Sequence, residues 1–414
     1  MSDTIYLDNA ATSYPKPGSV IDAVNEAMLN AGNPGRSGHA LSLWSGRAIE
    51  SARINVAAIF GEQNASRIVF ALNTTDALNT AIHGILNAAG TDNLDPATGK
   101  EHSNPAAGKD SPHPASAALP HVVTTSMEHN SVIRPLEALT EAGTLGSYTA
   151  VKTDQKNGTD PALIKAAIRP DTRLVVCTHV SNVTGTVNPV SEIGLVCKEA
   201  GIPFLVDAAQ SAGYIPFTAK ELNADMIAFP GHKGLLGPQG TGGLWIREGF
   251  ELKESRQGGT GSKSEERSQP KDMPDRFESG TQNTIGLAGL SAGAGYVLDR
   301  GIAAIAAHEA AMSNKMLDGL SRIKGIEIFG PPQGRGRSGV ISFRINGTSP
   351  QETSSILDNA FNIAVRSGLH CAPIAHETIG TLNTGGTVRV SAGIFTTEGE
   401  TDAFLEAVAE IANG

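Results

Sequence analysis

Short apolar segments alternate with longer amphipathic segments from the start of the chain to residue 246. Apolar side chains that recur every three or four positions predict helices, and short apolar runs bounded by Gly, Pro or polar residues predict strands. Because helices separate the strands, the pattern favours a mostly parallel, doubly wound sheet, in which ligands bind beyond the carboxyl ends of the strands. The predicted helices are 20–31, 43–60, 75–87, 160–168 and 190–200, and the predicted strands are 67–71, 121–125, 174–178, 204–206, 226–229 and 243–246.

The hydrophobic pattern changes near Leu287, where the apolar periodicity predicts one long helix that ends at Leu320. Beyond it, the spacing again predicts strands and helices, which indicates a second α/β unit. The predicted strands of this unit are 339–345 and 387–392, and its predicted helices are 352–361 and 398–412.

The length of 414 residues exceeds what a single hydrophobic core usually serves. We therefore predict an α/β protein with a large domain over residues 20–286 and a smaller domain formed by residues 1–19 and 287–414. Within the large domain, residues 88–120 are rich in Ala, Pro, Ser and Asn and lack periodicity. This segment predicts a flexible surface insertion at the sheet edge opposite the strand carboxyl ends, with a functional lid as the alternative.

The composition is that of an ordinary globular protein, with 40% hydrophobic and 18% charged residues. A net charge of −10 without a run of Lys or Arg argues against nucleic acid and anionic membranes as partners, so a small-molecule substrate is expected. Three scattered cysteines predict neither a disulfide framework nor a metal site, and Cys177 and Cys197 are expected to be packing residues. No signal peptide or membrane span is apparent, which predicts a cytoplasmic protein.

Two residues suggest the chemistry of the site. Asp207 follows a buried predicted strand, and Lys233 follows the next one in a Gly/Pro-rich stretch. An Asp in this position can keep a pyridine nitrogen protonated, and a partly neutral Lys can bind an aldehyde covalently. Gln210 would donate to the phenolic oxygen of the same ring. Alone, Asp207 would be a helix cap and Lys233 a solvated loop residue, but together these residues predict a pyridoxal 5'-phosphate site.

Three further positions follow predicted strands. His129 is placed to lie over a flat heteroaromatic ring, although a hydrogen-bonded structural His is the alternative. Thr74 and Thr75 open a helix, where hydroxyl and free backbone N–H groups form an anion site suited to phosphate, or a simple helix cap. Asn182 would reach the cofactor or the substrate, with an ordinary turn residue as the alternative.

The second domain contributes two candidates. Arg389 is flanked by valines in a predicted strand, so its guanidinium needs an anion, either a substrate carboxylate or a structural Asp or Glu. Cys371 lies in a Gly-containing segment near Arg366 and His370, a setting that can activate a thiol, whereas a free Cys is by default a buried and inert residue.

A series of motifs extends these candidates through nearly the whole chain. The motifs are Tyr6-Leu7-Asp8-Asn9-Ala10-Ala11-Thr12, Gly38-His39-Ala40-Leu41-Ser42, Met127-Glu128-His129-Asn130-Ser131, Ser181-Asn182-Val183-Thr184-Gly185-Thr186, Val206-Asp207-Ala208-Ala209-Gln210, Gly231-His232-Lys233, Phe277-Glu278-Ser279-Gly280-Thr281-Gln282-Asn283-Thr284, residues 366–371 and Arg389. With these motifs the chain resembles the SUF-type cysteine desulfurases and selenocysteine lyases, in the class V aminotransferase branch of fold-type I pyridoxal phosphate enzymes.

The resemblance implies a role for each candidate. Lys233 would bind the cofactor aldehyde, His129 would stack on the ring, and Cys371 would accept sulfur. The ring atoms and the phosphate would be held by Asp207, Gln210, Asn182, Thr74, Thr75 and His232, and the substrate by Arg389, Asn182, His39 and Arg366. Thr281 would reach the phosphate in the neighbouring subunit of a homodimer. Two positions depart from the pattern of relatives: Pro230 replaces a frequent Ser, and Leu369 replaces a frequent His.

The predicted activity is conversion of L-cysteine to L-alanine, with the sulfur left on Cys371 as a persulfide. Lys233 would remove the Cα proton while Arg389 holds the carboxylate. A sulfur-acceptor protein or small thiol, for example in iron–sulfur cluster assembly, would collect the sulfur. The alternatives are a selenocysteine lyase, a class V aminotransferase and, from a different class, a cofactor-binding regulator or a non-catalytic sulfur carrier.

Overall fold

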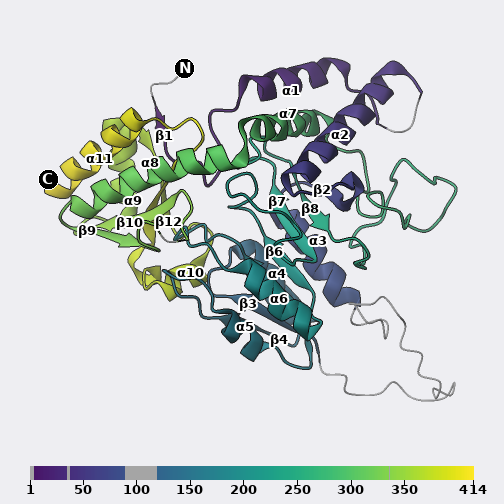
Figure 1. Cartoon of the computed structure of the whole chain (residues 1–414), viewed down its shortest axis with the longest axis horizontal. Helices are drawn as coiled ribbons and strands as arrows, with labels where there is room; N and C mark the ends of the chain where they lie inside the picture. Colours follow the sequence, from purple (N-terminus) through teal and green to yellow (C-terminus); the bar gives the residue numbers. More distant parts are fainter. Residues whose placement is uncertain (1–3, 35–37, 89–118, 335) are drawn as a thin grey trace.

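The computed structural model describes residues 4–34, 38–88, 119–334 and 336–414. Its larger sheet has seven strands in the order β2-β8-β7-β6-β5-β3-β4 (Figure 1). Strands β3 to β7 pair in parallel, and β8 is antiparallel to both of its neighbours, so the predicted fold class is confirmed. The strands are β2 Ile68–Ala71, β3 His121–Thr125, β4 Ser147–Val151, β5 Thr172–Thr178, β6 Phe204–Asp207, β7 Met226–Pro230 and β8 Gly242–Ile246.

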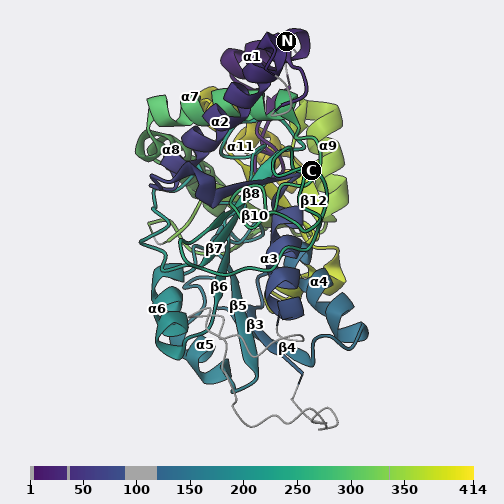
Figure 2. The ribbon, with the colours of Figure 1, turned by 90° about the vertical axis from the view of Figure 1, so that its right-hand side faces the viewer.

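Successive side chains of the central strands enter two different cores, one on each face of the sheet. In β5, Val175 and Cys177 pack on one face, and Leu174 and Val176 pack on the other. Helices therefore cover both faces (Figure 2). The first face is covered by α2 (Ala40–Ile59), α5 (Pro161–Ala167), α6 (Val190–Ala200) and α7 (Thr284–Arg300), with α1 (Gly18–Asn30) on α7, and the second by α3 (Thr74–Ala88) and α4 (Asn130–Glu141).

A smaller antiparallel sheet follows, in the order β12-β13-β10-β9. The chain start joins this unit, because β1 (Ile5–Tyr6) pairs in parallel with β11 (Ile363–Ala364) and Leu7 enters its core. The remaining elements are η1 Ala65–Arg67, β9 Ile326–Phe329, β10 Val340–Ile345, β12 Arg366–Gly368, β13 Thr387–Ser391, α8 Ile302–Arg322, α9 Pro350–Phe361, α10 Pro373–Thr378, η2 Leu382–Thr384 and α11 Glu398–Asn413.

The single helix predicted from Leu287 to Leu320 is wrong, because α7 and α8 are separate helices. Gly301 divides them with a φ of 81°, a conformation that costs glycine little. Leu287 and Leu290 pack in the core of the seven-stranded sheet. The division into two domains remains a prediction, and this packing favours a boundary at Gly301.

The predicted insertion over 88–120 falls mainly outside the described residues. Helix α3 ends at Ala88, and β3 begins at His121, the amino end of that strand. Within the part of the chain that the structure describes, no helix has the length and apolar composition to cross a bilayer.

Candidate active site

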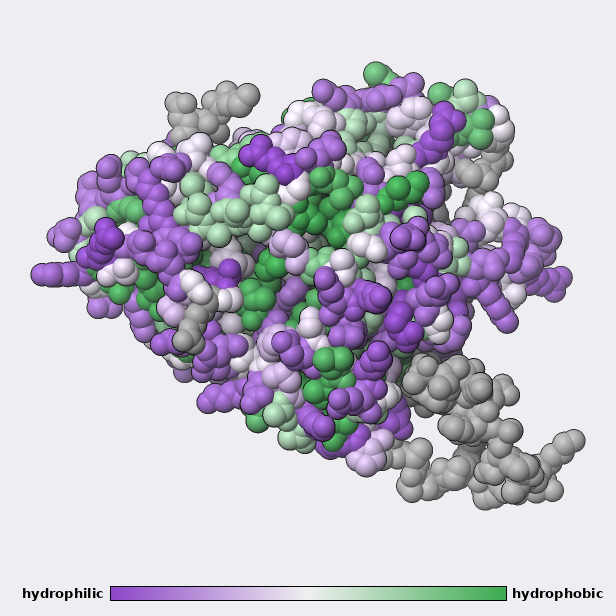
Figure 3. Space-filling model, viewed as in Figure 1, coloured by the Kyte–Doolittle hydropathy of each residue, from purple (hydrophilic) through white to green (hydrophobic). Residues whose placement is uncertain are grey.

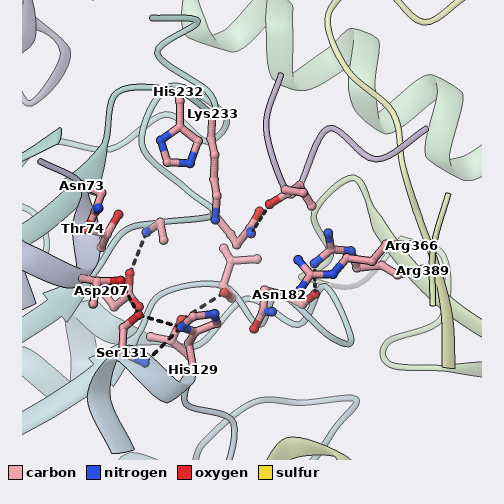
Figure 4. Close-up of a pocket in the computed structure, with 17 residues that line it drawn as sticks. Asn73, Thr74, His129, Ser131, Asn182, Asp207, His232, Lys233, Arg366 and Arg389 are labelled. Carbon is pink, nitrogen blue, oxygen red and sulfur yellow. Dashed lines mark hydrogen bonds between the residues drawn. The ribbon is translucent and has the colours of Figure 1, made fainter. Parts of the chain in front are cut away.

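A cavity of about 280 Å³ opens beyond the carboxyl ends of the central strands. Asp207 is the last residue of β6, Thr178 is the last residue of β5, and Lys233 follows β7. Figure 4 shows Lys233 extending into the cavity. The predicted residues that line it are Thr74, Thr75, His129, Asn182, Asp207, Gln210, His232, Lys233, Arg366 and Arg389.

Asp207 and Lys233 form a buried acid and base in this cavity. Burial raises the pKa of Asp207, against the opposing effects of the Ala209 N–H, which donates to Oδ1 at 2.8 Å, and of Lys233. Burial lowers the pKa of Lys233 to about 8, although Asp207 acts in the opposite direction. The amine is therefore close to its titration range at neutral pH, which a covalent nucleophile or a proton acceptor requires.

His129 is a hydrogen-bonded structural residue that also faces the cavity, and its place over a heteroaromatic ring stays a prediction. It caps α4, because its Nδ1 accepts from the Ser131 backbone N–H at 3.1 Å, and its ring also lines the cavity. Burial, followed by the charge of Lys233, lowers the pKa of His129 to about 4. The ring is therefore neutral at pH 7, and the bond to Nδ1 places its proton on Nε2.

Polar groups gather where α3 begins. Asn73 caps this helix, since its Oδ1 accepts from Asp76 N at 3.0 Å, so the cap is neither Thr74 nor Thr75. Thr75 Oγ1 lies 2.7 Å from Ser131 Oγ, which is itself 2.8 Å from His129 Nδ1. The helix N-terminus thus opens onto the cavity, and the prediction that it binds an anion there stays a prediction.

The carbonyl of His232, directly before Lys233, accepts several hydrogen bonds from the start of the chain. The donors are Thr12 Oγ1 at 3.1 Å, Ser13 N at 3.0 Å, Ser13 Oγ at 3.1 Å and Lys16 Nζ at 3.0 Å. These contacts tie the peptide that carries Lys233 to residues 12–16. Burial lowers the pKa of Lys16 to about 8.

Gln210 and Asn182 are held by one bond each to a neighbouring loop. Gln210 Nε2 donates to Ala10 O at 2.8 Å, and Asn182 Nδ2 donates to His370 O at 2.8 Å. Each amide has a second N–H, and both side chains line the cavity. Both can therefore contact a ligand without breaking these bonds.

Arg366 and Arg389 lie side by side on the wall away from Thr74 (Figure 4). Arg389 is 1% exposed; its Nη2 donates to Asp8 Oδ1 at 2.7 Å and its Nη1 to Asn182 O at 3.1 Å. The structural ion pair that the sequence left as an alternative is thus present. Sequence reasoning missed Asp8 as its partner, although the position of Asp8 just after a short apolar run was a signal.

Cys371 is an exposed thiol that contacts Arg366 but does not itself line the cavity. Arg366 Nη2 donates to its Sγ at 3.2 Å, and Asn130 N donates to its carbonyl at 2.8 Å. Cys371 and the preceding His370 have φ values of 57° and 49°, which are uncommon for residues other than glycine. Cys177 and Cys197 are buried, as predicted.

His39 and Thr281 do not line this cavity in the chain described. His39 is exposed and caps α2, because its Nδ1 accepts from Ser42 N at 3.2 Å. Thr281 lines a separate surface pocket beside Asn33 and Arg53. Sequence reasoning also missed Ser131, which contacts both Thr75 and His129.

A family model described as Aminotransferase class-V matches residues 5–107 and 112–404. The chain therefore belongs to the class V aminotransferase family, which confirms the resemblance predicted from its motifs. It is 37% identical to the probable cysteine desulfurase of Methanothermobacter thermautotrophicus, over 100% of this chain and 96% of that protein. It is 32% identical to the cysteine desulfurase of Haloferax volcanii, over 98% and 88%. A solved apo structure of cysteine desulfurase from Thermococcus onnurineus NA1 matches with a TM-score of 0.86 at 32% identity, over 100% and 95%.

Proposed function

We propose that this protein is a pyridoxal phosphate-dependent cysteine desulfurase. The observation that carries the proposal is the combination, in one cavity, of the buried Asp207 and Lys233 with a guanidinium that contacts an exposed thiol, Cys371. Relatives at 31–37% identity named as cysteine desulfurases support the same activity.

The cavity suits the cofactor in size and in donors. A cavity of about 150 Å³ is enough to bind benzene, and this one measures about 280 Å³. The imidazole ring of His232 has a buried nitrogen, Nδ1, without a hydrogen-bond partner among the described residues. Asp207 would hold the pyridine nitrogen, Gln210 and Asn182 the ring substituents, and His129 would cover the ring. Thr74, Thr75 and His232 would hold the phosphate.

When bound, the cofactor acts as an electron sink for charge that develops on the substrate Cα. The residues of the chain supply the remaining functions. Lys233, with its lowered pKa, accepts the Cα proton on Nζ and later returns a proton to the alanine product. The neutral His129 offers Nε2–H without adding a positive charge next to this amine.

The substrate carboxylate would bind on the Arg366 and Arg389 wall. Of the two guanidinium groups, Arg389 is paired with an acid, Asp8, and no ion pair joins Arg366 to another described residue, so the wall carries a net positive charge. A carboxylate neutralises this charge and directs the rest of a small amino acid towards Lys233.

Cys371 would take the sulfur. Its Sγ, as thiolate, forms a bond to the substrate Sγ while the substrate Cβ–Sγ bond breaks and its electron pair stays on carbon, where a proton replaces sulfur. Cysteine and the enzyme thiol thus become alanine and the enzyme persulfide, without an external oxidant or reductant. Arg366 Nη2, 3.2 Å from Sγ, would hold the attacking sulfur in place. A small thiol or an acceptor protein then removes the outer sulfur. We place this step in a reducing cytoplasm, where the sulfur would be used for iron–sulfur cluster assembly.

We further propose a homodimer in which Thr281 and His39 serve the site of the partner subunit. Exposed apolar side chains on and near α1 and α2 support such an interface: Ile21, Met28, Leu29, Leu41, Leu43 and Ile54. In Figure 3, apolar surface also interrupts the polar surface of the upper part of the molecule, where α1 and α7 lie. Mixing Thr281→Ala with Lys233→Ala subunits tests this arrangement, because a mixed dimer regains one complete site. No gain in activity on mixing contradicts it.

The decisive experiment incubates the purified protein, loaded with pyridoxal phosphate, with L-cysteine and measures alanine and sulfide with and without a reducing thiol. Cys371→Ser is expected to keep the visible absorbance of the bound cofactor but to form no persulfide, and Lys233→Ala to lose that absorbance. Full turnover by Cys371→Ser removes Cys371 from the reaction. An absolute need for a keto acid identifies an aminotransferase instead, and alanine production from selenocysteine alone identifies a selenocysteine lyase.

A further inference from the structure

A second acid, Glu128, lies behind the site and has no part in the chemistry above. It directly precedes His129, and it is 0% exposed. Its Oε1 accepts from Thr125 Oγ1 at 2.6 Å and from Thr178 N at 2.9 Å. Its Oε2 is buried without a hydrogen-bond partner among the described residues.

These two bonds connect Glu128 to both sides of the cofactor pocket. Thr125 is the last residue of β3, from which the His129 loop begins, and Thr178 is the last residue of β5. In the parallel ladder Thr178 is the partner of Asp207, the last residue of β6. Glu128 therefore fixes the separation between the strand end that positions His129 and the strand end beside Asp207.

Glu128 and Asp207 are two buried acids at the same edge of the sheet. Two negative charges in a poorly solvated interior repel each other strongly, so one acid of such a pair ordinarily keeps its proton. Asp207 accepts one hydrogen bond and Glu128 accepts two, but a cation, Lys233, acts on Asp207 and none acts on Glu128 among the described residues, so the negative charge is better stabilised on Asp207. Glu128 is therefore the acid that is expected to stay protonated.

The electrostatic environment supports this assignment. Burial, together with the negative charge of Asp207, raises the pKa of Glu128 to about 8, although its bonds to Thr125 and Thr178 act in the opposite direction. Two titratable groups on neighbouring strands are coupled to it: Asp207 on β6 and the thiol of Cys177 on β5. Burial raises the pKa of that thiol well above its usual range, so it stays neutral.

We propose that Glu128 is a positioning residue that remains a neutral carboxylic acid at pH 7, so that the single buried negative charge of this corner stays on Asp207. The role of Asp207 as partner of the pyridine nitrogen rests on the proposed function. The distribution of charge between the two acids does not, because it concerns the protein without any ligand.

The first test therefore uses the protein without cofactor. A folded-state pKa above that of the unfolded chain means that the folded state binds more protons between about pH 4.5 and pH 8, so stability falls as pH rises through that range. Glu128→Gln keeps an oxygen that can accept both bonds but cannot titrate. From pH 5 to pH 8, the melting temperature of the wild type should fall relative to that of Glu128→Gln by about 2 °C or more. Glu141→Gln, at the exposed last residue of α4, is the matched control and should follow the wild type.

Parallel melting curves for the wild type and Glu128→Gln across this range overturn the proposal. If Glu128→Gln does not fold, infrared spectra of the wild type decide between the two outcomes. Burial also raises the pKa of Asp207 and of Glu309, so the spectra are compared with those of Asp207→Asn and Glu309→Gln. A protonated carboxyl band at pH 7 that disappears above pH 8 and is retained in both variants supports the proposal, and the absence of such a band at pH 7, or its loss in either variant, overturns it.

The second test uses the protein loaded with pyridoxal phosphate and titrates its visible absorbance from pH 6 to pH 10. In the wild type, ionisation of Glu128 adds a second charge near Asp207, so the absorbance should show a component near pH 8 that is missing from Glu128→Gln. A merely structural cross-link would not produce this difference, because Gln preserves both bonds. If no cofactor absorbance appears in either protein, the proposed function fails, while the measurements without cofactor still decide the charge of Glu128.

Discussion

Arg366 on β12 and Arg389 on β13 are direct cross-strand partners in an antiparallel ladder. Like charges in this relationship destabilise a sheet unless an anion joins them. Asp8, which lies next to the short strand β1, reaches Arg389 and compensates one of the two charges. The remaining positive charge, on Arg366, lies beside Cys371 and supports the proposal that this wall binds a substrate carboxylate.

Arg366→Lys should weaken substrate binding because a single ammonium cannot make the paired hydrogen bonds of a guanidinium. The loss of one hydrogen bond to a charged group corresponds to a rise in KM for cysteine of about 10-fold to 100-fold. Steady-state kinetics measure this change, and Arg322→Lys, at the exposed end of α8, is the control. An unchanged KM would show that the carboxylate binds elsewhere.

The acid and the amine of the site could be predicted from the sequence because each lies in a local motif at the end of a buried strand. The partner of Arg389 could not, since Asp8 is 381 residues away and reaches it only after β1 has paired with β11, beside the smaller sheet. The division between α7 and α8 was also missed. Apolar periodicity continues across Gly301, and a glycine inside a helix costs only about 1 kcal/mol, so the pattern itself contains no signal for a break.

Lys16→Met should change how stability depends on pH. Burial lowers the pKa of Lys16 from 10.5 to about 8, so between these values the unfolded chain binds more protons and the stability of the wild type rises with pH. The variant should lack this contribution. The lowered pKa of Lys233 makes stability rise with pH in both proteins, so the difference between wild type and variant reports on Lys16 alone.

Melting temperatures of the cofactor-free proteins from pH 7.5 to pH 10.5 test this prediction, where the wild type should gain stability relative to Lys16→Met. The control is Lys324→Met at an exposed position. A constant difference between wild type and variant at every pH would mean that Lys16 titrates as a solvated lysine.

Gly231→Ala should disturb the peptide that leads to Lys233. A Cβ added at this position would overlap the hydroxyl oxygen of Thr241 and lie 2.9 Å from the Cβ of Thr241. Overpacking of this kind costs about 1–3 kcal/mol, and the displaced segment contains His232 and Lys233. We expect a lower melting temperature and weaker absorbance of bound pyridoxal phosphate. Gly399→Ala, which meets no atom within 4 Å, should change neither.

Glu278→Gln should cause the largest loss of stability among these variants. Glu278 is 7% exposed and binds Arg53, which is 4% exposed, through two bonds of 2.7 and 2.9 Å. It also accepts from Phe70 N at 2.7 Å. Removing its charge leaves a buried guanidinium with no buried acid to compensate it, which costs about 3–5 kcal/mol.

The chain contains a matched control for this prediction, because Glu50 lies 3.8 Å from the same guanidinium with 59% of its side chain exposed. Glu50→Gln should cost about 0–1 kcal/mol, since solvent screens an exposed pair. Urea unfolding of the cofactor-free proteins measures both values. Equal losses for the two variants would mean that the Arg53–Glu278 pair is solvated.

The Arg53–Glu278 pair should also matter for activity. Since Thr281 lies three residues after Glu278, the same pair holds the segment whose Thr281 we assign to the phosphate site of the partner subunit. Glu278→Gln should therefore lower activity more than its remaining folded fraction accounts for, whereas Glu50→Gln should not.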